Sequence, residues 1–302
     1  MAGAPGIQFA SNFPEVTDLD PVLTEIYYQH LGELDPMLER LFRVLDSNKA
    51  KETDLRIGSF GDPQEFRDRV IYDAAEPDYT IEYSHTEYAS GFKIQRKLFD
   101  DKMYGGFFES AEDLGRAFRR KVEKDAASLF NNAFSTLGYD GKALCADDHP
   151  RSESDSTNVD NKLALALTAD NLNTAWVQFQ SLVDDRGELI SANPDLLIVP
   201  PNLMRTAHEL TRSALDPESA ENAVNPYAGL QYMVWNRLTD TTAWFLVDST
   251  MMRRYLKWYW RVRPEFKGEQ DFDTYIRKYA GYMRYSFGWS DFRWVIGSTG
   301  GD

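Results

Sequence analysis

The sequence predicts an α+β protein that folds as one large domain or as two closely associated ones. Its predicted elements run in the order extended arm, β-ribbon, one long helix, mixed α/β region and strand-rich end. This order differs from the regular βαβα alternation of a parallel-sheet protein. The chain has 302 residues, of which 42% are hydrophobic and 14% aromatic, which is ample for a sizeable core. No internal repeat is visible.

Composition and charge argue against several classes of protein. The chain carries 48 acidic and 33 basic side chains, and its net charge of −15 makes it a poor binder of nucleic acid or anionic membranes. A single cysteine, Cys145, excludes an intramolecular disulfide and zinc sites built on several thiolates, and it favours a reducing cytosolic origin. No apolar run approaches the roughly 18–20 residues that span a bilayer, and no secretory signal is visible. We therefore expect a soluble protein made inside the cell.

The charge is unevenly distributed along the chain. Residues 251–302 hold ten basic and six acidic side chains, whereas the preceding 250 residues hold 23 basic and 42 acidic ones. This asymmetry fits head-to-tail association of copies as well as it fits ordinary surface scatter.

The first 45 residues predict an arm followed by two helices. Residues 1–20 are rich in small residues, glycine and proline, which is typical of an extended arm. Apolar residues at helical spacing then form two stripes between residues 21 and 45, separated by Pro36, and the second stripe runs from Met37 to Leu45.

A protruding, charged β-loop is predicted at residues 56–92. Residues 56–78 show no period, and nine of these 23 residues are charged. Residues 79–83 and 92–95 alternate as strands do, and we expect them to form a ribbon with a turn between them. Such a protrusion has little core of its own and needs a partner to lie on.

Residues 109–134 predict the longest helix. Ser110 is a candidate N-cap, and acidic side chains follow it in the first turn. An apolar stripe at spacings of three and four is formed by Leu114, Phe118, Val122, Ala126, Leu129 and Ala133. Basic side chains cluster on the other faces at Arg116, Arg119, Arg120, Lys121 and Lys124. They could contact nucleic acid, but salt bridges along the helix explain them more simply.

The second half of the chain alternates helices and strands irregularly. A polar loop is expected at 146–162 and another at 216–230. Helices are predicted at 171–183 and 203–215. Strands are predicted at 196–199, 232–235, 243–247, 256–262, 275–287 and 292–296.

The chain lacks the residue patterns of an enzyme. Its four histidines have no metal-ligand spacing, and no phosphate-binding or nucleophile motif is present. The loop 147–149 (Asp-Asp-His) could bind a cation weakly or act in a metal-dependent hydrolase, but a solvated acidic loop is the simpler interpretation. Cys145 is best explained as a small buried residue. The aromatic run 258–260 could form a carbohydrate platform, although a strand packed on both faces accounts for it.

Five short segments, in a fixed order along the chain, carry a family resemblance. They are 88–98 (YASGFKIQRKL) with Asp100 and Asp101, 134–144 (FSTLGYDGKAL) leading to His149 and Pro150, 194–201 (PDLLIVPP), 223–226 (AVNP) and 238–246 (LTDTTAWFL). On these segments the chain resembles the major capsid (major head) proteins of tailed bacteriophages, and among them the Mu-like major head protein group. The resemblance extends from about residue 20 to residue 298.

The resemblance implies the shell fold shared by tailed-phage heads, herpesvirus floors and encapsulins. It implies an N-terminal arm with helices at 1–55, an extended loop over a neighbouring subunit at 56–92, a peripheral domain with its spine helix at 93–139, an axial domain at 140–250, and strands returning to the peripheral domain and axial sheet at 251–302. The residues that it points to are Phe60, Arg67, Arg69 and Tyr72 in the inter-subunit loop, Leu114, Phe118, Val122 and Leu129 on the spine helix, and Arg116, Arg119, Arg120 and Lys124 on the inner wall.

The implied function is structural, with no enzymatic activity, cofactor or metal. Copies would assemble as pentamers and hexamers into an icosahedral head, built in the host cytoplasm, that encloses double-stranded DNA without reading its sequence. Scaffold, portal and decoration proteins are the implied partners, and no membrane is. Because the body begins near residue 20, we expect a separate scaffold protein, or none, in place of a fused scaffolding segment. The alternatives are an encapsulin-like nanocompartment shell and the metal-dependent hydrolase that would use the 147–149 loop.

Overall fold

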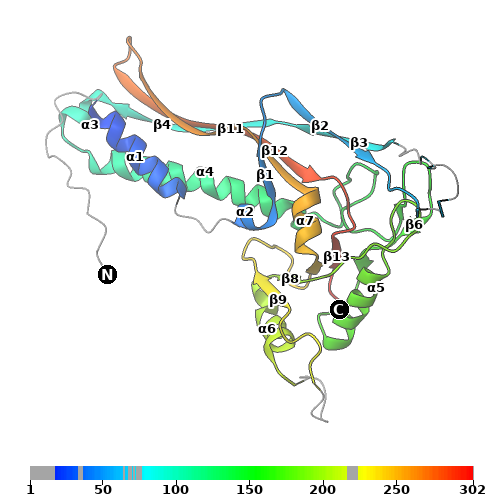
Figure 1. Cartoon of the computed structure of the whole chain (residues 1–302). Coiled ribbons are helices and arrows are strands. Elements are labelled where there is room, and N and C mark those ends of the chain that lie inside the picture. Colours follow the sequence, from blue (N-terminus) through cyan, green and yellow to red (C-terminus); the bar gives the residue numbers. More distant parts are fainter. Residues whose placement is uncertain are drawn as a thin grey trace. The chain divides into compact units, whose positions relative to one another are not determined.

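The protein is described by a computed structural model over residues 18–32, 37–63, 65–66, 70, 72, 77–215 and 224–301 (Figure 1). The chain divides into two compact units. Unit 1 is made of residues 1–36, 86–122 and 260–285, and unit 2 of residues 37–85, 123–259 and 286–302. Helix α4 (Gly105–Asn131) and strands β11 (Leu256–Gln270) and β12 (Ile276–Trp289) contribute residues to both units. Among the described helices, none has the length and apolar character needed to cross a membrane.

Unit 1 packs two helices on an antiparallel sheet. It contains α1 (Leu19–Gly32), β4 (Thr86–Gln95) and α3 (Arg96–Asp100), and its strands lie in the order β11-β12-β4. Tyr27 of α1 stacks on Phe266 of β11 with ring centroids 4.8 Å apart, and its ring meets the edge of Phe118 from α4 at 5.9 Å. Gly115 permits the close approach of α1 and α4, because a Cβ there would lie 2.5 Å from the Tyr27 carbonyl oxygen.

Unit 2 is organised around a five-stranded mixed sheet of order β7-β13-β10-β8-β9. Its strands are β7 (Lys162–Leu163), β8 (Leu196–Val199), β9 (Gln231–Val234), β10 (Trp244–Val247) and β13 (Val295–Ser298), with a small pair formed by β5 (His149–Pro150) and β6 (Asn158–Val159). Its helical segments are α2 (Met37–Leu41), α5 (Ala169–Gln180), η2 (Pro201–Leu203), α6 (Met204–Arg212) and α7 (Ser249–Tyr255). All four residues of β10 are buried, because the strand lies between β13 and β8.

The ribbon of unit 2 is formed by β2 (Lys51–Ile57) and β3 (Pro77–Ser84), which pair antiparallel. The expected pairing of residues 79–83 with residues 92–95 is therefore wrong. Only His85 separates β3 from β4, so no turn forms, and β4 pairs along its length with β12 instead. The sequence analysis had not assigned residues 51–57 to a strand, and they supply the missing partner.

Two other local predictions need correction. Leu45 was expected on a helix, but it lies in β1 (Arg43–Asp46), because α2 ends at Leu41. The long helix begins at Gly105, so Ser110 is not its N-cap. The Ser110 hydroxyl lies inside the helix and donates to the Gly106 carbonyl oxygen at 2.7 Å, a bond that serine readily makes in the second turn of a helix.

Candidate assembly site at the base of the ribbon

The residues predicted for the inter-subunit loop include two large exposed aromatic side chains. Phe60 is 69% exposed and Tyr72 is 90% exposed, while Arg67 and Arg69 lie outside the described residues. Leu55 and Ile57 of β2 are also exposed, which the sequence analysis missed. Exposed apolar side chains gathered on one protruding element indicate a surface that another molecule covers.

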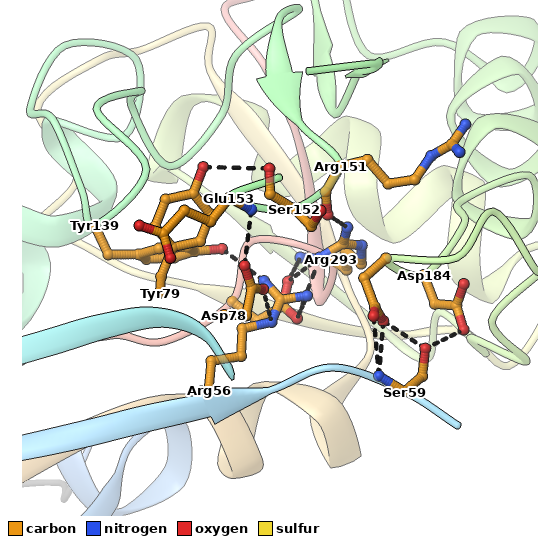
Figure 2. A network of polar contacts seen from close by, with 12 residues as sticks. Arg56, Ser59, Asp78, Tyr79, Tyr139, Arg151, Ser152, Glu153, Asp184 and Arg293 are labelled. Carbon is orange, nitrogen blue, oxygen red and sulfur yellow. Dashed lines mark hydrogen bonds and ion pairs between the residues drawn. The ribbon is translucent and has the colours of Figure 1, made fainter. Parts of the chain in front are cut away.

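The base of the ribbon is held by a buried ionic cluster, which we call the ribbon base: Arg56, Asp78, Asp291 and Arg293 (Figure 2). Arg56 on β2 contacts Asp78 on β3 with Nε to Oδ2 at 3.2 Å, and Asp291 with a terminal nitrogen at 3.1 Å. Arg293 contacts the same Asp291 carboxylate at 3.2 Å. The cluster thus ties both strands of the ribbon to the loop before β13.

The electrostatics of the cluster favour the charged state of its members. Burial alone disfavours the guanidinium of Arg56, but the neighbouring Asp291 carboxylate keeps its pKa above the ordinary value. Burial likewise opposes ionisation of Asp291, but Arg293 and Arg56 hold its pKa below the usual range. Burial raises the pKa of Tyr139 well above its usual value, so this phenol stays neutral and accepts a hydrogen bond from Arg56 at 3.1 Å.

Backbone groups complete the anchoring. Arg293 donates to the carbonyl oxygens of Val183 and Arg151, both at 2.7 Å. Asp78 accepts from the backbone N–H of Glu153 at 2.8 Å (Figure 2). Each buried ionic group therefore has several partners, as a buried ion pair requires if it is not to destabilise the fold.

A second anchor lies just past the end of β2. The Ser59 hydroxyl donates to Asp184 at 2.7 Å, and its backbone N–H donates to Asp185 at 3.0 Å. Arg186 returns a hydrogen bond to the Ser59 carbonyl oxygen at 2.8 Å. Ser59 is thus fixed to the rest of unit 2, while the apolar side chains that follow it are exposed. This arrangement is typical of a surface that binds another molecule, and not of a catalytic site.

We expect Asp291→Asn to destabilise unit 2 by about 3–5 kcal/mol near pH 7, because it leaves two buried guanidinium groups without their shared carboxylate. Since Asp291 has a depressed pKa in the folded protein, its contribution is present above the ordinary carboxyl pKa of about 4 and is lost as the pH falls below it. Urea unfolding from pH 3 to pH 8 measures both effects.

The matched control for this experiment is Asp148→Asn, which removes an ion pair with Lys142 whose two side chains are both well exposed. Solvent screens that pair, so the variant should unfold almost as the wild type does. The difference in the free energy of unfolding between wild type and Asp291→Asn should shrink toward pH 3. A difference that stays the same down to pH 3 would show that Asp291 does not act through its charge.

Comparison with known proteins identifies the family. The family model described as "Phage capsid protein" matches residues 78–297, nearly three quarters of the chain. The chain belongs to this family. It is a phage capsid protein, a structural component of the virion. No curated protein matches its sequence.

Solved structures show the same fold at low sequence identity. The procapsid of bacteriophage JBD30 superposes with a TM-score of 0.55 at 16% identity, covering 94% of this chain and 74% of that chain. The capsid of cyanophage P-SCSP1u gives 0.58 at 12% identity over 88% and 90% of the two chains, and a virus-like particle from Pyrococcus furiosus gives 0.54 at 11% over 92% and 98%. The expected α+β capsid fold is therefore confirmed.

In this capsid protein the predicted stripe of α4 lies mostly in the core. Leu114, Phe118 and Leu129 are buried, and Val122 is half-buried. The basic residues differ from one another. Arg116 pairs with Glu112 on the same helix and Arg119 is half-buried, whereas Arg120 and Lys124 are exposed.

The 147–149 loop, considered above as part of a metal-dependent hydrolase, is held in the protein interior by His149. His149 is fully buried, bonds to the Asp140 carboxylate at 2.6 Å and stacks on Phe292 with centroids 3.7 Å apart. Asp147 is exposed, and among the described residues no group of three or more side chains could hold a metal ion. Cys145 is buried, and burial raises the pKa of its thiol, which keeps it unreactive. His149 and Cys145 therefore lie in the packed interior of unit 2.

Proposed function

We propose that this capsid protein assembles as pentamers and hexamers that close into the head around double-stranded DNA, and that it belongs to the Mu-like group of major head proteins. The observation that carries the first proposal is the ribbon, which is fixed by the buried charges around Arg56. It exposes Leu55 and Ile57 on either side of Arg56, and Phe60 and Tyr72 in the segment that follows. Each such contact buries a modest area, but closed symmetry repeats it over every subunit. The Mu-like assignment is supported by the five sequence segments quoted above.

The segments receive the following roles in this proposal. Residues 1–55 form the arm and its helices, 56–92 the extended loop lying on a neighbour, 93–139 the peripheral domain with α4 as spine, 140–250 the axial domain, and 251–302 the strands that return to both. Scaffold, portal and decoration proteins would contact the shell that these subunits form.

Packaged DNA would face a largely acidic wall with a few cations. Net charge is −15, so most of the surface repels phosphate and lets DNA pack and leave. The exposed Arg120 and Lys124 of α4 are the best placed of the predicted inner-wall residues, because Arg116 is paired with Glu112 and Arg119 is half-buried.

Negative-stain electron microscopy of the purified protein, with nuclease-treated particles assayed for DNA, tests this function. We expect closed shells tens of nanometres across, and DNA-filled shells from infected cells. Shells that enclose a protein cargo and no DNA would favour a nanocompartment. Only monomers or small oligomers, with or without co-expressed scaffold, would contradict shell assembly.

A further inference from the structure

Unit 2 carries a group of exposed arginines where three short elements pack together. Helix α2, strand β1 and helix α7 contact one another (Figure 1). Their buried side chains are apolar. Phe42, just after α2, meets the edge of the Trp258 ring with centroids 5.7 Å apart, and Met252 of α7 is fully buried. The arginines that flank these positions are exposed, and we call them the arginine cluster: Arg40, Arg43, Arg253 and Arg254.

Cations outnumber acids on these three elements. Together α2, β1 and α7 carry four arginines and two acidic residues, Glu39 and Asp46. Among the described residues, no carboxylate forms an ion pair with a member of the arginine cluster, whereas Arg205 and Arg237 elsewhere in unit 2 each have one. Uncompensated like charges repel, and a bound anion relieves the repulsion. In a chain of net charge −15, this local excess of cations indicates a site for an external anion.

A cavity of about 610 Å³ opens beside two of these arginines. Arg43, Arg254 and Tyr255 line it, and the guanidinium carbon of Arg254 lies 5.3 Å from the centroid of the Tyr255 ring. Burial raises the pKa of the Tyr255 phenol, so its hydroxyl keeps its proton and can donate a hydrogen bond. The cavity therefore offers two guanidinium groups and one neutral donor to the same ligand.

The four carboxylates that line this cavity already have partners. Asp54 pairs with Lys257, and Asp291 belongs to the ribbon base. The other two, on the loop after α5, accept hydrogen bonds from Ser59. The two members of the arginine cluster are thus the cations of the cavity whose charge is still available to a ligand.

The chemistry of arginine suits a phosphate ligand. The planar guanidinium presents paired N–H donors that match two oxygens of one phosphate, and every member of the cluster is an arginine. A backbone that repeats its phosphates can contact the cavity and the neighbouring Arg40 and Arg253 at the same time. Each such contact releases a counterion and adds to the affinity. Duplex DNA is a polyanion of this kind.

We infer that the arginine cluster binds phosphate groups, one of them held by Arg43 and Arg254 at the cavity. This rests on the proposed function, in which the head encloses double-stranded DNA, and it names the backbone of that DNA as the source of the phosphates. Contacts to phosphates alone carry no base sequence, as an enclosing shell requires. The cluster lies outside α4, where the sequence analysis had placed the cations of the inner wall.

Removing two charges of the cluster tests the inference. In the full chain, Arg43→Gln combined with Arg254→Gln should weaken binding of a short DNA duplex about tenfold at low salt. The slope of log affinity against log salt should fall by about two, one for each lost phosphate contact. Fluorescence anisotropy of a labelled duplex measures both quantities.

The matched control is Arg205→Gln combined with Arg212→Gln. It removes the same charge from exposed positions of α6, where Arg205 pairs with Glu209 and Arg212 lies over the Tyr232 ring. Because these arginines already have partners in the chain, the control should bind the duplex with nearly the affinity and salt slope of the wild type.

Thermal unfolding separates the two sources of phosphate. Inorganic phosphate should raise the melting temperature of the wild type more than that of the Arg43 and Arg254 double variant, compared with sodium chloride at equal ionic strength. If it does so while both proteins bind the duplex equally, the site takes free phosphate and the assignment to DNA is wrong. If neither phosphate nor duplex distinguishes the two proteins, the whole inference is wrong.

Shell assembly, scored by electron microscopy, is read separately. A double variant that forms normal shells but binds the duplex weakly supports the inference and leaves the proposed assembly intact. A double variant that loses shells but keeps duplex binding would show that the cluster contacts another subunit, and would overturn the inference.

Should the double variant misfold, the wild type decides. Bound duplex should protect Arg43 and Arg254 from phenylglyoxal, whereas Arg205 and Arg212 should react equally with and without DNA. Mass spectrometry of digested protein measures the modification at each site. Equal modification of Arg43 and Arg254 with and without DNA would contradict the inference.

Discussion

Replacing residues 60–76 with a short glycine–serine turn is expected to abolish shell formation while leaving the subunit folded. Ile57 and Pro77 pair across the two strands, so a short turn can join them without disturbing the ribbon. Arg56, Asp78 and Ser59 are retained, and with them both anchors of the base. The variant loses the exposed side chains that a neighbour would cover, and this loss is intermolecular. Size-exclusion chromatography and electron microscopy measure shells, and thermal unfolding measures the subunit.

The matched control keeps residues 60–76 and removes only one side-chain hydrogen bond that holds Ser59 in place. Ser59→Ala removes the hydroxyl bond to Asp184 but leaves the backbone bond to Asp185 and all the exposed side chains. It should assemble, with at most a reduced yield. If the 60–76 replacement forms normal shells, residues 60–76 do not make the contact between subunits that we propose.

The ribbon itself shows why part of this fold could not be predicted. In β2 the apolar Leu55 and Ile57 are exposed, and the charged Arg56 between them is turned inward to its ionic partners. The usual rule that apolar side chains of a half-buried strand point inward is thus inverted. Residues 79–83 were recognised as a strand, but without residues 51–57 they were paired with the wrong partner.

Segments with ordinary amphipathic patterns were predicted well. The stripe that contains Leu114, Phe118 and Leu129 identified α4 because each of these side chains faces the core at helical spacing. The strand 196–199 was located correctly, since four consecutive apolar residues between prolines leave little alternative. Boundaries were less accurate where local hydrogen bonding decides them, as at Ser110.

The ribbon base could not be predicted because its members lie far apart in the sequence. Arg56 and Asp291 are separated by more than two hundred residues, and no spacing relates them. One feature of the sequence could have indicated this cluster. Asp291 and Arg293 lie on either side of Phe292, within a stretch of aromatic and apolar residues. Charged residues in such a context have to find buried partners, which marks them as candidates even when the partners are unknown.

Phe118→Glu is expected to unfold the subunit, with a loss of about 5 kcal/mol or more in the free energy of unfolding. Phe118 is 3% exposed, and its ring packs against Tyr27 and beneath Gly281. Removing the ring leaves a cavity, and the carboxylate would be buried without a cation to pair with. We expect insoluble protein or a strongly lowered melting temperature, and loss of shells as a consequence of misfolding.

Arg120→Glu, two residues along the same helix, is the control that separates burial from charge. Arg120 is exposed, so this larger change in charge should alter the free energy of unfolding by less than about 1 kcal/mol. The contrast also separates the two kinds of failure. Phe118→Glu should lose the fold and the shell together, whereas the 60–76 replacement should lose only the shell. Equal stability of the two helix variants would mean that α4 does not pack through the face that contains Phe118.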